Sequence, residues 1–226
     1  MKLSKSNLSK MNDQLEEVFK KISYKVSNIH VHLQLYEQVY QSKEVVKVVN
    51  ESAKFFFAKT QYVFVDNIIL SIARLLDPAI SGSFKNLSLE QLLNQLKNDE
   101  NSGEDLIKRL EVLLQKIQNL IEAFKVHRNK RIAHLDLEIN KNESAGSLPE
   151  ISEDNMYEII RHLDQFMNEI NYHYNATEVD YKIMLPKDSD GRALIHQLIK
   201  GKAYDQLEND GKIEKNYWMN IYSDLP

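Results

Sequence analysis

The chain has 226 residues, enough for one domain, or one domain with an appendage, to bury a core without covalent staples. It has no cysteine, which excludes disulfides, zinc–cysteine sites, iron–sulfur clusters and cysteine nucleophiles. With 29 Lys and Arg against 33 Asp and Glu, the net charge of −4 gives no bulk attraction to nucleic acid, so such a role needs a local basic patch.

Only 6 Gly and 4 Pro leave little room for a β architecture with many turns, and the composition is typical of an all-α protein. Residues 1–21 alternate charged and apolar positions, without the continuous apolar core of a signal peptide. No later run approaches a membrane span. We therefore expect a cytoplasmic protein with no membrane contact.

The first predicted element is helical. Apolar residues recur at spacings of three and four from Leu8 to Tyr40, which predicts one long amphipathic helix or two helices in series. Residues 29–35 also alternate like a strand, but both flanks keep the helical period. His30 and His32 point apart on a helix, so we do not interpret them as a metal site.

The second element, at 53–76, is apolar on nearly all sides and predicts a central buried helix with Phe55, Phe56 and Phe57 in the core. Pro78 and the Ser-Gly-Ser at 81–83 end it. Asp66 and Arg74 are polar exceptions eight positions apart. An internal ion pair explains them better than a site role, although Arg74 is kept as a candidate for substrate binding.

The next two elements are also helices. Ser88, with Gln91 three positions later, predicts a capped shorter helix. From Leu106 to Phe124, apolar residues follow at spacings of four and three, and the same rhythm continues onto His127, Arg131 and His134. The positions that continue the apolar seam on the same helix face thus carry ionisable side chains.

The rest of the chain predicts a loop at 140–149, a helix at 156–170, a short extended segment at 179–185 and a helix at 192–207. Tyr217 and Trp218 follow, either as cover for the bundle or as part of a partner surface. We predict an all-α, up-and-down helical bundle over residues 1–176 and a C-terminal extension over 177–226.

Residues 127–136, His-Arg-Asn-Lys-Arg-Ile-Ala-His-Leu-Asp, form the densest group of reactive side chains. Arginine binds phosphate oxygens as a fork and histidine moves protons near neutral pH, which suggests work on a phosphodiester without a metal ligand set. Arg128, Asn129 and, five intervening residues after the arginine, His134 resemble the signature of the HEPN superfamily (higher eukaryotes and prokaryotes nucleotide-binding). The ending Ile-Ala-Arg-Leu-Leu-Asp-Pro at 72–78 resembles its abortive-infection branch, and the similarity covers roughly residues 10–175.

The resemblance implies a metal-independent ribonuclease, without cofactors, that cleaves RNA as a homodimer with two motifs in a shared cleft. The RNA 2′-OH attacks its own phosphate, so the protein has to move protons and stabilise the phosphorane charge. His134 would be the general acid or base, Arg128 would hold the non-bridging oxygens, and Asn129 would orient the substrate or the histidine. Candidate substrate-binding residues are His127, Lys130, Arg131, Asp136 and Arg74.

Several alternatives stay open. Arg128 and Arg131 also fit a solvated helix end, and His134 fits a capping or core histidine. Asp136 either orients His134 or caps the next turn. On a straight helix Arg128 and His134 lie about 240° apart, so the helix ends or bulges within the motif, or a dimer completes the site. Arg131 does share a face with His134 and would supplement or replace Arg128.

Three functions compete. The first is an RNA endonuclease that acts as an abortive-infection or toxin effector, held in check by an antitoxin or other regulatory protein. The second is a non-catalytic module that binds a nucleotide, RNA or a protein. The third is a structural or immunity bundle that dimerises through residues 106–124.

Some HEPN toxins carry a modifiable tyrosine two positions after the histidine of the motif. In this chain Asp136 occupies that position, so neutralisation by tyrosine modification is not implied.

Overall fold

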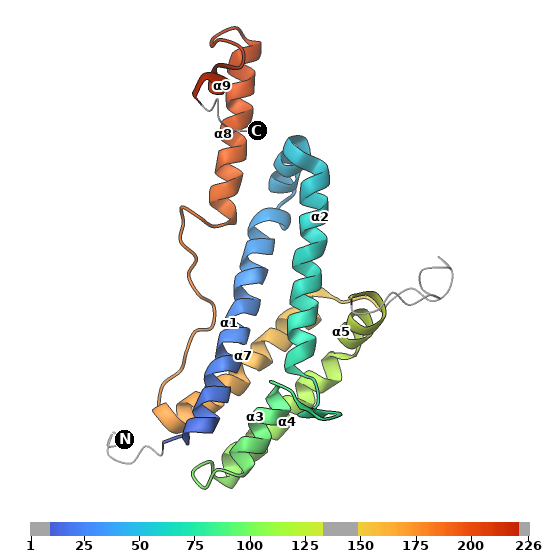
Figure 1. The fold of residues 1–226 in the computed structure, drawn as a ribbon, viewed down its shortest axis with the longest axis vertical. Coiled ribbons are helices and arrows are strands. Elements are labelled where there is room, and N and C mark those ends of the chain that lie inside the picture. Colours follow the sequence, from blue (N-terminus) through green and yellow to red (C-terminus); the bar gives the residue numbers. More distant parts are fainter. Residues whose placement is uncertain (1–9, 133–148, 222–226) are drawn as a thin grey trace. The chain divides into compact units, whose positions relative to one another are not determined.

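The structure is a computed structural model that describes residues 10–132 and 149–221 and is helical over most of them (Figure 1). The predicted all-α helical bundle is confirmed. The helices are α1 Asp13–Tyr40, α2 Lys43–Leu75, α3 Leu89–Lys97, α4 Glu104–Leu120, α5 Glu122–His127, the π-helix η2 Arg128–Ile132, α7 Glu153–Asn175, α8 Gly191–Asn209 and α9 Tyr217–Ile221; β1 Ile80–Ser81 pairs antiparallel with β2 Phe84–Lys85.

The chain divides into two compact units, to which α1 and α2 both contribute. The first unit comprises residues 1–32 and 65–183, and the second comprises residues 33–64 and 184–226. The predicted division into 1–176 and 177–226 stays a prediction. The candidate site belongs to the first unit.

The core of the first unit comes from the apolar faces of α1, α2, α3, α4 and α7. α4 packs against α7 and α3 packs against α4. Full burial of one such aliphatic side chain contributes about 1.5–3 kcal/mol. Deeply buried residues include Leu15, Ile22 and Ile29 of α1, Ile72 of α2, Leu89, Leu92 and Leu96 of α3, Leu106, Leu110 and Ile117 of α4, and Ile159, Leu163, Phe166 and Ile170 of α7. The apolar seam at 106–124 is therefore covered within one chain and is not left open for a second copy.

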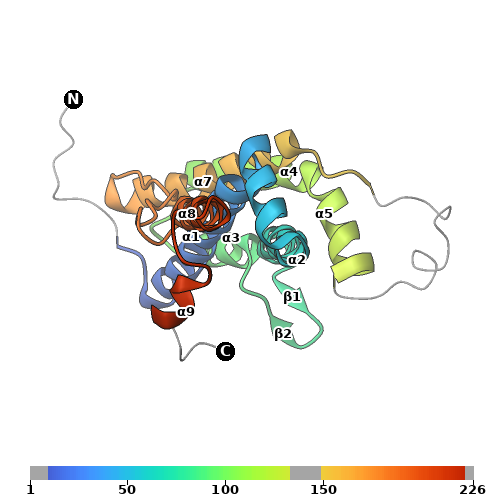
Figure 2. The same cartoon turned by 90° about the horizontal axis from the view of Figure 1, so that it is seen from above.

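Helix α3 begins where the sequence predicted a cap. The Ser88 hydroxyl is buried and accepts a hydrogen bond from the backbone N–H of Gln91 at 3.3 Å. This bond satisfies one of the backbone donors that the first helical turn leaves without a partner. Figure 2 shows that the β1–β2 hairpin, which follows α2 at residues 80–85, projects away from the helices of the first unit.

The second unit has a small core of its own, in which Val39, Val49, Phe57 and Ile195 are buried together. Asp190 caps α8 and accepts a bond from Gln38 Nε2 at 3.1 Å, while Gln38 Oε1 accepts from Gly191 N at 2.8 Å. A Cβ at Gly191 would lie 2.9 Å from Gln38 Oε1, so this contact depends on the glycine.

One core prediction is wrong. Phe57 is buried, but Phe55 is 77% exposed and Phe56 is 62% exposed, and Tyr62 and Val63, about two turns later, are exposed as well. These four residues lie at helical spacing on one face of α2, and we call them the α2 stripe. The segment is apolar all round, as the sequence indicates, but the described part of the second unit buries only the side that carries Phe57.

Two further expectations concern the segment after α7 and the absence of a membrane span. Residues 179–185 form neither a strand nor a helix, so the predicted extended segment makes no ladder in the structure. Among the residues that the structure describes, no helix is long and apolar enough to pass through a membrane.

Candidate functional site

The helical run through α4 and α5 changes geometry where the motif begins. α4 ends at Leu120, α5 restarts at Glu122, and the backbone then widens into the π-helix Arg128–Ile132. π-Helical turns bond residue i to i+5 and occur frequently at functional sites. Of the alternatives that the 240° separation left open, a bulge within the motif is observed.

Arg128 is held at two points. Its Nη1 donates to Asp77 Oδ1 and its Nε donates to Asn129 Oδ1 at 3.0 Å. The two side chains of the ion pair are only 23% and 26% exposed. A guanidinium offers five N–H donors in a rigid fork. Only Nε and Nη1 make hydrogen bonds within residues 10–132 and 149–221, so no described residue accepts from the Nη2 amino group.

Asp77 reaches this position because α2 stops two residues earlier. The following Pro78 disfavours helical backbone at Asp77, so α2 ends at Leu75 and the chain turns. The sequence prediction missed Asp77 as a site residue. It did single out the Arg-Leu-Leu-Asp-Pro ending, and a lone carboxylate at the end of an apolar helix was the signal available.

His127 is tied to the chain that enters α7. Its Nε2 lies 2.8 Å from the carbonyl oxygen of Pro149, and because a carbonyl only accepts, Nε2 is the donor. Its Nδ1 is buried without a partner in the described structure. In this arrangement His127 joins the two segments that flank the motif, whereas its predicted role in substrate binding stays a prediction.

The remaining candidate residues divide by position. Asn129 and Lys130 are exposed at the start of η2, and Arg74 is exposed on the last turn of α2. Three predictions lie outside what the structure describes, namely the side chain of Arg131, and His134 and Asp136. The structure thus brings Arg128, Asn129 and Asp77 together.

A cavity of about 310 Å³ adjoins this ion pair in the first unit. Arg74 lines this cavity, and so does Asp77, whose carboxylate binds Arg128. We call it the α2-end pocket. Its other lining residues are Lys25 of α1, Ser71 and Leu75 of α2, and Asn86 and Leu87 after β2.

Elsewhere in the first unit, a pair of ionisable residues links two helices. His30 Nε2 lies 2.8 and 3.0 Å from the two carboxylate oxygens of Asp164, which links α1 to α7. His30 is thus paired with a carboxylate on another helix. No group of three or more His, Asp or Glu side chains suited to a metal ion occurs in the part of the chain described.

An all-α bundle whose helical run passes into a π-helix at Arg128-Asn129, with a histidine in the sequence five intervening residues after the arginine, is typical of a HEPN-type protein. The family model of the HEPN abortive-infection family described as AbiU2 matches residues 6–192, and the chain belongs to this family. No curated protein and no solved structure matches the chain.

Proposed function

We propose that this HEPN protein is a metal-independent RNA endonuclease that acts as an abortive-infection effector. The observation that supports this most directly is the Arg128 guanidinium, fixed by Asp77 and Asn129 at the start of a π-helix. A cation held in place before the substrate arrives needs no reorganisation when charge develops on a phosphorane. A merely solvated helix end does not require such an anchor.

The reaction uses the RNA 2′-OH as the nucleophile. The 2′-oxygen forms a bond to the adjacent phosphorus, and the bond from phosphorus to the 5′-oxygen of the next nucleotide breaks. His134 takes the 2′-OH proton or donates a proton to the leaving 5′-oxygen, and Arg128 binds the non-bridging oxygens. The products are a 2′,3′-cyclic phosphate and a 5′-OH end.

The active form in this proposal is a homodimer, and the α2 stripe supports it. Three of its four members are aromatic, and aromatic side chains bury about 150–250 Å² each in an interface. A stable interface takes about 800 Å² from each partner, so the stripe supplies roughly half of that share. Lys59 Nζ lies 5.5 Å from the centroid of the Phe55 ring. This charged group forms a polar rim beside the apolar face, as protein interfaces commonly have.

Total RNA incubated with purified protein in excess EDTA tests the proposal. Wild-type protein is expected to fragment the RNA, and His134→Ala is expected to lose at least about a hundredfold of this activity, the usual weight of a positioned acid or base. Fragmentation at the same rate by both proteins would remove His134 from the site. A folded wild-type dimer that leaves the RNA intact would instead favour a binding module or a toxin held in check by a partner.

A further inference from the structure

The α2-end pocket is next to Arg128 but does not include it. Asp77 lines the pocket and binds the Arg128 guanidinium, so one carboxylate separates the two places. The pocket's walls come from α1, from the last turn of α2 and from the segment after β2, all in the first unit. A ligand in the pocket therefore lies beside whatever Arg128 holds.

The pocket carries positive charge that no described residue of the chain neutralises. Lys25 and Arg74 are both exposed, and neither makes an ion pair within the described chain. Other lysines of α1 do find partners, since Lys20 and Lys21 pair with glutamates one turn earlier at 2.5 and 2.6 Å. Asp77 is three positions after Arg74 but is occupied by Arg128.

The whole chain has a net charge of −4. Two cations that no described residue pairs, placed around one cavity, attract an anion locally even when the protein as a whole does not. Lysine offers a point charge with three donors and arginine offers a fork, and both bind phosphate.

The other walls limit what the anion can be attached to. Leu75 and Leu87 give the pocket an apolar side, and Ser71 and Asn86 add polar groups. Asn86 already donates through Nδ2 to Pro78 O at 2.7 Å and to Ser81 Oγ at 2.8 Å, which fixes its amide against the hairpin. The volume of about 310 Å³ is at the lower end of ligand pockets, which span about 300–1,000 Å³. It suits one nucleotide rather than a larger ligand.

We infer that the α2-end pocket binds the phosphate of a ribonucleotide next to the one that is cleaved, through Lys25 and Arg74. This inference rests on the proposed function, because the neighbouring phosphate is assigned to Arg128. The ion pair with Arg128 neutralises the Asp77 carboxylate, so Asp77 does not repel the RNA strand. The pocket sets where the strand lies, whereas Arg128 acts on the bond that breaks.

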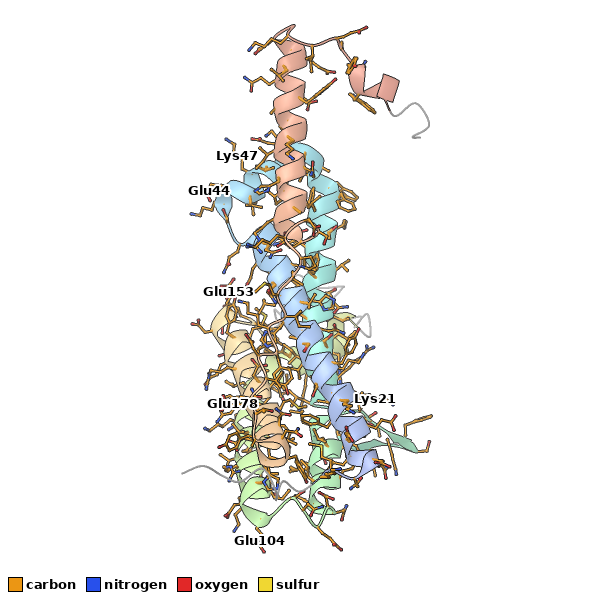
Figure 3. The ribbon with its side chains drawn as sticks, turned by 90° about the vertical axis from the view of Figure 1, so that its left-hand side faces the viewer. Lys21, Glu44, Lys47, Glu104, Glu153 and Glu178 are labelled. Atoms are coloured by element: carbon orange, nitrogen blue, oxygen red, sulfur yellow. The ribbon has the colours of Figure 1, made fainter. Side chains whose placement is uncertain are left out.

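The test uses a fluorescent single-stranded RNA whose 2′-oxygens are methylated, so that it cannot be cleaved through a 2′-OH. Its affinity is measured by anisotropy at several salt concentrations for wild type, Lys25→Ala and Arg74→Ala. Each substitution is expected to weaken binding about tenfold and to reduce the slope of log K against log salt by about 0.7. Lys21→Ala, one turn earlier on α1 and labelled in Figure 3, makes the same charge change outside the pocket and is expected to have little effect.

Cleavage of the unmethylated strand is read in parallel, which separates the two claims. Equal affinities and slopes for Lys25→Ala, Arg74→Ala and Lys21→Ala would overturn the pocket assignment even if wild type cleaves RNA. Wild-type protein that does not bind the methylated strand would overturn it as well. If the two pocket variants bind more weakly but wild type cuts nothing, the pocket stands as an RNA-binding site, and the result favours a binding module or a toxin held in check over a nuclease that is active on its own.

Discussion

Asp77 and Arg128 lie 51 residues apart in the chain and form an ion pair between the end of α2 and the start of η2. With Asn129 on the Nε side, the guanidinium is fixed at two nitrogens, and no residue of 10–132 or 149–221 binds the third. A fork held in this way loses little freedom when it binds a phosphate. In the proposed function, Asp77 is therefore a positioning residue for Arg128 rather than a group that touches substrate.

Replacing Asp77 by Asn tests this role. The amide keeps the size of the side chain but removes the charge that holds Arg128, so we expect kcat for RNA cleavage to fall about 10- to 100-fold while KM changes little. Steady-state kinetics on a defined RNA give both constants. Asp105→Asn, which removes an exposed acid from the first turn of α4, is the control. A rise in kcat for Asp77→Asn would contradict the positioning role, because Asp77 would then be competing with the phosphate.

The α2 stripe predicts a change of oligomeric state. A double substitution of Phe56 and Tyr62 by Glu places two charges on the proposed contact, and we expect the dimer to become a monomer at micromolar protein. Light scattering after size-exclusion chromatography measures the mass. Phe84→Ser, which removes an even more exposed phenylalanine from β2, is expected to leave the dimer intact. A double variant that is still dimeric, or a wild-type monomer, would rule the stripe out as the interface.

The loop between α3 and α4 is held by a buried hydroxyl. Tyr174 of α7 donates to Asp99 Oδ2 at 2.5 Å, and its oxygen lies 2.8 Å from Ser102 Oγ; burial and the bond to Asp99 raise the pKa of Tyr174. Tyr174→Phe leaves these groups without their partner and is expected to lower the free energy of unfolding by about 1–3 kcal/mol. Tyr172→Phe removes an exposed hydroxyl and is expected to change it by less than about 0.5 kcal/mol. Similar urea midpoints for the two variants would contradict the role assigned to this hydroxyl.

His162 predicts how stability depends on pH. Burial, and then the adjacent Arg161, lower the pKa of His162 in the folded chain, whereas the unfolded value is about 6.5. As the pH falls through 6.5, the unfolded chain binds a proton that the folded chain resists, so the free energy of unfolding decreases. Burial lowers the pKa of His32 and acts in the same direction.

His162→Leu is expected to reduce this loss. The measurement is the free energy of unfolding in urea at several pH values between about 7 and about 5.5, a window set by the unfolded histidine value of about 6.5. A variant whose stability falls with pH as steeply as that of wild type would show that His162 does not contribute.

Features that act over a few residues could be predicted from the sequence. The Ser88 cap was predicted because capping depends on residues three positions apart, and the seam that begins at Leu106 was predicted because burial follows the helical period. The motif at Arg128 was recognised through the resemblance, and the family match confirms the family. The bulge in the motif was expected only as one alternative, since the helical period shows a mismatch without showing how the backbone resolves it.

Features that depend on tertiary contacts could not be predicted. No local pattern pairs Asp77 with Arg128, because their contact requires the end of α2 and the start of η2 to meet in the folded chain. The sequence predicts Phe55 and Phe56 in the core because apolar side chains are usually buried. It does not show which face of the helix the neighbouring elements cover. The pocket was missed for the same reason, since Lys25 and Arg74 come from different helices.

The most direct test of the central claim is the cleavage of a defined RNA oligonucleotide in excess EDTA, with the ends of the products identified by mass spectrometry. Wild-type protein is predicted to leave a 2′,3′-cyclic phosphate and a 5′-OH. Arg128→Ala and His134→Ala are predicted to lose at least about a hundredfold in rate, and a 2′-deoxy substitution at the cleaved position is predicted to block the cut there. Cleavage that needs added Mg²⁺, that persists at the 2′-deoxy position, or that proceeds equally in Arg128→Ala would contradict the account.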